Sequence, residues 1–262
     1  REFWITQEAF NVRINAEGKL SVLHNSSGSV SLTSTSVVNN NQWHHYSVVK
    51  TADSLFLYVN GIKEARAYSN RYINNLIVTV LNLGLHKDWD EYEGWMDDFS
   101  IFKRALSSEE IQDLMQNQLQ GNEANLLLYY DFNEYEEDVT FFDKSVNKIN
   151  AGFNGNVIVR RLAEGVTCNK DYIFPPTTDC GTVVKLDGKD DHIVTNFGGG
   201  IFYGRSFTIE SWVYLDDYNP GEASVIASTR VGNEGLMFYV GGDGAGGRKG
   251  RLCFDIGEPG VN

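Results

Sequence analysis

The chain has 262 residues, enough to bury a large hydrophobic core in one large domain or two ordinary ones. Its 35 Asp and Glu residues outnumber 22 Lys and Arg, and the formal net charge of −13 excludes the basic stripe of a nucleic-acid-binding protein. No apolar run approaches the roughly 18 residues of a transmembrane helix, so we expect no membrane span.

Short segments rich in β-branched and aromatic residues follow one another along most of the chain, with Gly, Asn, Asp or Ser between them. Many alternate apolar and polar residues, which is the pattern of a strand with one buried face. Because almost no helical segment separates them, we expect an all-β fold, an antiparallel β-sandwich. In chain order, the expected strands are 10–16, 19–25, 29–35, 44–51, 55–61, 76–84, 95–102, 207–215, 224–230, 235–242 and 251–257.

One segment, SSEEIQDLMQNQLQ at 107–120, has the pattern of a helix instead. Ser107 is a good helix cap, and Glu110 three positions later completes a capping box. The apolar stripe at helical spacing consists of Ile111, Leu114 and Met115. We therefore expect a short helix at about 107–118 that packs on a sheet.

The chain also contains a weak internal repeat. Residues 235–256 have the pattern of residues 2–23: a strand, a turn, then Gly, a basic residue and Leu, and another strand. Gly18-Lys19-Leu20 aligns with Gly250-Arg251-Leu252. The repeat predicts that the chain begins about halfway through one module and stops about halfway through the next, as a fragment would.

Several motifs occur in a fixed order: NQWHHYSVVKTADSLFLYVNGIKEA and YEGWMDDFSIFKRALSSEEIQDLM, then LLLYYDFNE, VVKLDGKDDHIV and SFTIESWVYL. Together they resemble the laminin-G-like, concanavalin A-like lectin/glucanase jelly-roll modules of extracellular proteins. In that family the motifs of the second group precede those of the first. The resemblance therefore implies that 1–118 is the later part of one module, 119–124 a linker, and 125–262 the earlier part of a second module in tandem.

The alternative is one circularly permuted sandwich, to which 125–262 gives the early strands and 1–118 the late strands. The internal repeat favours tandem modules, because one sandwich would then need the same two strands twice. By resemblance, MDDFSIFKRAL is a strand that leads into the closing helix, and Phe99, Ile101 and Leu106 are core residues. Trp43 and Trp212 are expected on sheet faces.

Neither zinc binding nor catalysis is predicted. Strand alternation places His44 and His45 on opposite faces, so they cannot share one ion. The acidic clusters at 88–93 and 134–138 lie beside turns and not within apolar strands, so we expect solvated loops and not a catalytic carboxylate pair. The prediction is a chain that is not an enzyme and has no catalytic residue.

Calcium is the one metal that the resemblance implies. Related sandwiches often hold a Ca²⁺ ion where the first strand of a module meets the last. The corresponding carboxylates are Asp97 in GWMDDF, Asp131 in YYDFNE and Asp143 in FDKSVN. The alternative is that these Asp residues cap the backbone of their own turns.

Two features indicate an extracellular or cell-surface protein. Cys168 and Cys180 flank a loop that contains two prolines, and we expect a disulfide bond between them. Cys253 would be a buried or unpaired thiol. HNSSG provides an N-glycosylation site at Asn25, in an expected turn, as in a secreted glycoprotein.

The segment HKDWDEYEGW is the expected ligand-binding loop. Trp89 and Tyr92 offer aromatic faces, and Asp88, Asp90 and Glu91 could accept hydrogen bonds from sugar hydroxyls. The alternative is that Trp89 folds back onto its own sheet.

We therefore expect a non-catalytic module for extracellular recognition, cell adhesion or structure. Its partners would be a glycan, an extracellular protein, or other copies or modules of a larger assembly, and not nucleic acid. The alternative is an accessory carbohydrate-binding domain of a larger secreted glycosidase or protease.

Overall fold

The structure is a computed structural model. It describes residues 9–14, 19–25, 30–37, 42–68, 80–84, 92–133, 135–136, 140–161, 182–196, 206–215, 224–228, 235–241 and 251–257.

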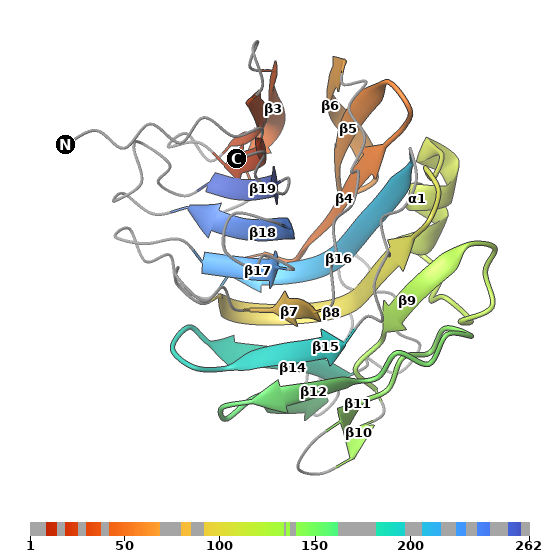
Figure 1. Cartoon of the computed structure of the whole chain (residues 1–262), viewed down its shortest axis with the longest axis vertical. Helices are drawn as coiled ribbons and strands as arrows, with labels where there is room; N and C mark the ends of the chain where they lie inside the picture. The colour runs from red at the N-terminus through yellow and green to blue at the C-terminus, as the bar shows by residue number, and fades with distance from the viewer. Residues whose placement is uncertain are drawn as a thin grey trace, which may run out of the picture.

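Most described residues belong to two antiparallel sheets that pack face to face (Figure 1). Sheet I contains, in spatial order, β10 (Tyr135–Glu136), β11 (Thr140–Phe141), β12 (Ala151–Asn154), β15 (His192–Asn196), β7 (Val80–Leu83), β17 (Ser224–Ser228), β18 (Gly235–Gly241) and β19 (Arg251–Gly257). Sheet II contains β13 (Ile158–Arg161), β14 (Thr182–Asp187), β8 (Glu93–Phe102), β16 (Phe207–Leu215), β4 (His44–Lys50), β5 (Ser54–Val59) and β6 (Ile62–Tyr68). β9 (Leu126–Tyr130) also pairs with β8.

A smaller sheet joins β1 (Ala9–Ile14), β2 (Lys19–Asn25) and β3 (Val30–Val37). β1 lies alongside β19 of sheet I. At the other side, the backbone N–H and the hydroxyl of Ser36 on β3 both donate to the carboxylate of Glu64 on β6. Both copies of the internal repeat are therefore present as hairpins, β1–β2 in the small sheet and β18–β19 in sheet I.

The two parts of the chain share the same sheets, which differs from the expected tandem arrangement. β8 lies between β14 and β16, and β7 lies between β15 and β17, so strands from 1–118 have neighbours from 125–262 on both sides. The segment 119–124 is packed against the body: a Cβ on Gly121 would lie 2.1 Å from the carbonyl oxygen of Lys144. The structure thus has the permuted arrangement, one sandwich built from both parts.

The predicted fold class, an all-β antiparallel sandwich, is confirmed. Alternating residues of each strand face the other sheet and form the main core, which includes Tyr46, Val48, Leu83, Met96, Phe99, Ile101, Tyr130, Phe141, Val184, Leu186, Ile193 and Val213. The expectation that Phe99 and Ile101 are core residues is correct.

The predicted helix and its cap are also confirmed. α1 (Ser108–Leu114) is the one α-helix among the described residues, and it ends a few residues earlier than expected. The hydroxyl of Ser107 accepts from the N–H of Glu110 at 3.2 Å, and the Glu110 carboxylate accepts from the N–H of Ser107 at 2.8 Å. In Figure 1, α1 lies beside sheet II, on the side away from β17, β18 and β19. The cluster beneath it consists of Val49, Tyr58, Phe102, Leu106, Ile111, Leu126 and Tyr129.

Candidate functional site

The face of sheet II that points away from sheet I carries the side chains that could take part in binding or catalysis. Residues paired directly across antiparallel strands point to the same face. Trp212 pairs with His45, and Tyr214 pairs with Trp95, so this outer face has polar and aromatic side chains where the inner face is apolar. As predicted, His45 lies on the face opposite His44, next to Trp212 with ring centroids 5.2 Å apart.

A small hollow lies on this face, between the end of α1 and the sheet. Glu210 is at its floor, where its carboxylate accepts hydrogen bonds from the hydroxyls of Ser100 at 2.8 Å and Ser47 at 3.2 Å. The Nε2 atom of His45 lies 3.8 Å from the same carboxylate. The full lining is His45, Asp98, Leu114, Asn117, Gln118, Leu119, Tyr129, Glu210 and Trp212. The open space is about that of one water molecule.

Asp98 reaches the hollow because β8 has a bulge. The pairing of β8 with β16 shifts between Glu210 and Trp212, and Asp98 takes the left-handed backbone conformation with φ of 48°. The hydroxyl of Tyr129 donates to Asp98 Oδ1 at 2.6 Å. Burial raises the pKa of Tyr129, so this hydroxyl stays protonated as the donor.

The hollow is a region of strongly shifted pKa values. Burial raises the pKa of Glu210 to about 7 and that of Asp98 to about 7, although the hydrogen bonds that each carboxylate accepts act to lower its pKa. Burial, with the neighbouring charges of Asp98 and Asp131, raises the pKa of Asp97 well above its usual range. Burial lowers the pKa of His45 to about 3, so its contact with Glu210 is not an ion pair at neutral pH. Five buried side-chain atoms have no hydrogen-bond partner among the described residues: His45 Nδ1, Asp97 Oδ2, Asp98 Oδ2, Gln118 Nε2 and Thr195 Oγ1. His45, Asp98 and Gln118 line the hollow.

The three predicted calcium ligands have different environments. Asp97 is fully buried, and Asp131 is close enough for its charge to raise the pKa of Asp97. One oxygen of Asp131 lies 3.7 Å from Lys144 Nζ. Asp143, in contrast, accepts from the N–H groups of Tyr129, Ser145 and Ile149 and from the Ser145 hydroxyl, at 2.7–3.0 Å. The alternative interpretation, a turn-capping carboxylate, is therefore correct for Asp143.

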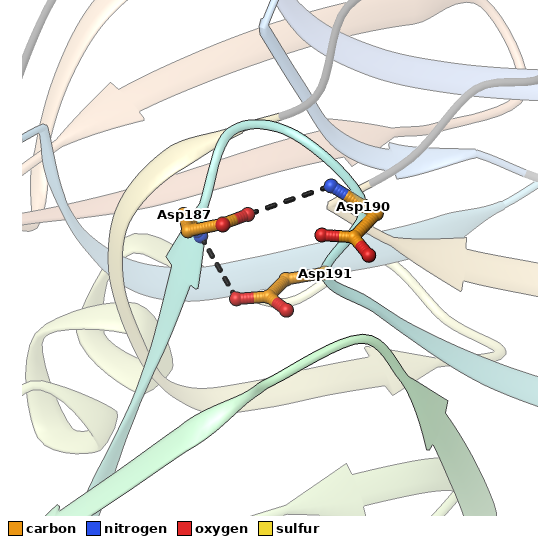
Figure 2. Close-up of side chains that lie close together, drawn as sticks. All are labelled: Asp187, Asp190 and Asp191. Atoms are coloured by element: carbon orange, nitrogen blue, oxygen red, sulfur yellow. Dashed lines mark hydrogen bonds between the residues drawn. The ribbon is translucent and has the colours of Figure 1, made fainter.

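A second acidic group lies in the turn between β14 and β15, in the motif LDGKDDH (Figure 2). Oxygens of Asp187, Asp190 and Asp191 all lie within 4.8 Å of one another, the spacing that a metal ion would require. However, Asp191 is buried and accepts from the N–H groups of Asn156 and Asp187, while Asp187 accepts from the N–H groups at 189 and 190. These hydrogen bonds stabilise the turn and explain the motif. The sequence analysis did not predict this role.

An aromatic row crosses sheet II on the same outer face. The rings of Trp43 and Tyr214 have centroids 5.9 Å apart, and Trp95 pairs with Tyr214 on the next strand. Lys185, which pairs with Trp95, places its ammonium group 5.3 Å from the Trp95 ring centroid. Trp43 is buried, whereas Tyr214, Trp95 and Lys185 are half-buried. The prediction that Trp43 and Trp212 lie on a sheet face is correct.

The expected binding loop is described only at its end. Asp88, Trp89, Asp90 and Glu91 lie outside the described residues. Tyr92 is not the exposed aromatic face that we expected: it is fully buried, and its hydroxyl donates to the carbonyl oxygens of Trp95 at 3.1 Å and Tyr214 at 2.8 Å. Tyr92 is adjacent to acidic residues in the sequence, but it is a core residue whose hydrogen bonds join β8 to β16.

The remaining predicted positions are described in part or not at all. Asn25 is the last residue of β2, so the sequon begins where this strand ends and not within a described turn. Cys253 lies in β19, as its alternating sequence indicates. Cys168 and Cys180 lie outside the described residues.

Comparison with known families gives one match. Residues 3–112 match the model of the Laminin_G_3 family, described as the concanavalin A-like lectin/glucanases superfamily. The matched segment contains β1 to β8 and the first residues of α1. The match and the antiparallel sheets are consistent with a concanavalin A-like β-sandwich, the fold that the resemblance implied. The match does not include 125–262, where a second module was expected.

No curated protein matches the chain. None of the helices in the described part of the chain is long and apolar enough to span a membrane.

Proposed function

We propose that this chain is a non-catalytic recognition module that acts outside the cell and binds a glycan or a protein partner. The match of residues 3–112 to a lectin and glucanase superfamily supports a sugar-binding or protein-binding role. The observation that favours binding over catalysis is the small volume of the hollow. Its two carboxyls have the raised pKa values of general acids, but the space beside them accommodates about one water molecule.

Glycoside hydrolysis requires both carboxyls to flank the bond that breaks, with a substrate ring between them. Here Glu210 is buried and accepts hydrogen bonds from Ser47 and Ser100. The end of α1 and the residues after it narrow the hollow through Leu114, Asn117, Gln118 and Leu119. The carboxyls therefore have an environment suited to internal packing, and the partner would bind on the exterior.

The test of this proposal compares binding with turnover. The chain is incubated with laminarin, xylan and alginate, and both complex formation and new reducing ends are measured. We expect binding to a glycan or to a protein partner without release of reducing ends. Hydrolysis that is present in the wild type and lost in Glu210→Gln would overturn the proposal.

We also propose that the acidic residues at the β8–β9 junction hold a Ca²⁺ ion. Asp97 and Asp98 fit, because each has a buried oxygen that lacks a described hydrogen-bond partner, and the charge of Asp131 raises the pKa of both. Asp97 is fully buried, and Asp98 is half-buried. Such carboxylates gain from a hard cation that would compensate their charge. Asp143 does not fit, because both its oxygens already accept backbone N–H groups. The ion would therefore contact Asp97, Asp98 and Asp131.

Thermal unfolding with Ca²⁺ or with EDTA tests the calcium proposal. Ca²⁺ at about 100 times its Kd should stabilise the fold by about 2.7 kcal/mol. Asp97→Asn should abolish this gain, whereas Asp190→Asn, in the separate β14–β15 turn, should retain it. The absence of stabilisation in the wild type, or its loss in Asp190→Asn, would contradict the proposed position.

A further inference from the structure

We propose that the outer face of sheet II carries a binding platform for an extended, uncharged polysaccharide, formed by Tyr214, Trp95, Lys185 and Ile158. This inference rests on the proposed recognition function and assigns it a place and a ligand class. The four residues lie on four adjacent strands, β16, β8, β14 and β13.

Strand register places these residues in one straight row. Tyr214 pairs with Trp95, Trp95 with Lys185, and Lys185 with Ile158. Since directly paired residues point to the same face, all four side chains lie on the side of sheet II away from the main core. With a strand spacing of about 4.8 Å, the row is about 14 Å long, which suits a linear chain of sugar rings.

The row is accessible along its length. Ile158 is 46% exposed, and Tyr214, Trp95 and Lys185 are half-buried. Trp43 is buried behind Tyr214 and supports its ring at a centroid distance of 5.9 Å. An apolar surface with a rigid backing allows the C–H faces of pyranose rings to pack against it with little loss of side-chain entropy.

The charges around the row favour an uncharged ligand. Glu93 and Asp187 pair with each other and lie two residues along their strands from Trp95 and Lys185, so alternation places them on the same face. Asp190 in the adjoining turn is exposed. These carboxylates can accept hydrogen bonds from sugar hydroxyls, but they repel uronates and sulfates, as does the net charge of −13. Lys185, with a single charge, offsets only part of this repulsion.

Tyr92 joins the main chain of two residues of the row from the core side of the sheet. Its hydroxyl donates to the carbonyl oxygens of Trp95 and Tyr214, so hydrogen bonds hold the backbone that carries these two rings.

Affinity electrophoresis of the whole chain tests the inference, in gels with hydroxyethylcellulose or laminarin as uncharged probes and alginate as the anionic probe. We expect retention by an uncharged polysaccharide, weakened at least about tenfold by Trp95→Ala and clearly reduced by Ile158→Asp. Tyr68→Ala is the matched control, because Tyr68 is 64% exposed at the far edge of sheet II and should not affect retention. Circular dichroism verifies folding of each variant, and Ile158→Asp remains informative if Trp95→Ala does not fold.

Each outcome is distinguishable from failure of the proposed function. If the wild type is retained and both row variants match it, the platform is wrong but a recognition role stands. Retention by alginate alone overturns the uncharged ligand class. No retention on any gel overturns the inference and leaves recognition of a protein partner, whereas release of reducing ends overturns the proposed function itself.

Discussion

Asp98 on β8 and Glu210 on β16 line one small hollow, and burial, with a smaller contribution from the charge of Asp98, raises the pKa of Glu210 to about 7. The ordinary pKa of a glutamate is 4.5, so folding favours the protonated form of this side chain. Two carboxylates cannot both ionise in so closed a space without a cost in free energy. The fold therefore depends on pH through this pair.

Glu210 should make the free energy of unfolding fall as pH rises. An acid whose pKa is raised by folding binds more protons in the folded state, so its stabilising effect is complete below pH 4.5 and is lost as pH rises through about 7. The loss is about 1.4 kcal/mol per pH unit within that window. Urea unfolding in EDTA should therefore give lower stability at pH 8 than at pH 5.

Glu210→Gln should remove the share of this difference that Glu210 contributes, because the amide is uncharged at both pH values. Its oxygen can accept from one serine hydroxyl and its NH2 group can donate to the other. Asp97 and Asp98, whose pKa values are also raised, should retain the rest of the difference. Glu109→Gln, on the exposed first turn of α1, is the control and should leave the difference unchanged. An equally steep pH dependence in Glu210→Gln would mean that other groups control stability.

The binding loop gives a prediction that separates two neighbouring aromatic residues. Tyr92→Ala removes a fully buried ring and two hydrogen bonds to the main chain, and should destabilise the fold by about 3–5 kcal/mol. Trp89→Ala, if Trp89 binds ligand as the sequence predicts, should weaken ligand capture and leave the Tm within a few degrees. Thermal unfolding and affinity electrophoresis of both variants give the answer. Unfolding by Trp89→Ala would assign Trp89 to the core.

Local sequence patterns predicted the features that depend on neighbouring residues. The capping box at Ser107 requires only a partner three positions away, and the core positions Phe99 and Ile101 follow from strand alternation. The hollow could not be predicted in this way. Asp98 and Glu210 are far apart in the sequence, and a bulge that no alternation pattern reveals turns Asp98 toward Glu210.

The prediction that Tyr92 is exposed was wrong, and it rested on the acidic residues next to Tyr92 in the sequence. Polarity of the neighbours indicated an exposed loop, but the N–H of Tyr92 donates to Gly84 at 3.0 Å and its hydroxyl joins two strands. For Asp143, family resemblance indicated a metal ligand, whereas the backbone donors of its own turn occupy the carboxylate. In both cases tertiary hydrogen bonds decide the role of the side chain.

The Cys168–Cys180 disulfide bond stays a prediction that a mass measurement can test. The bond would restrict the unfolded chain over a short loop and contribute on the order of 2–3 kcal/mol. Under non-reducing conditions, alkylation should label Cys253 alone, and reduction should expose two further thiols and lower the Tm. Three alkylated cysteines without reduction would remove the bond and weaken the case for an extracellular location.

The shared sheets predict that the two parts of the chain fold only together. Separation at 119–124 would leave β8 without β14 and β16, and β7 without β15 and β17, so each part would expose an apolar face and unpaired strand edges. Residues 1–118 and 125–262, produced separately, should therefore lack cooperative thermal unfolding. Mixing them should restore the circular dichroism spectrum and a single transition, since the contacts between β8 and β16 do not require the connecting segment. If instead each part unfolds cooperatively by itself and mixing changes neither transition, the parts are independent units, and the tandem arrangement that the internal repeat predicts would replace the single sandwich.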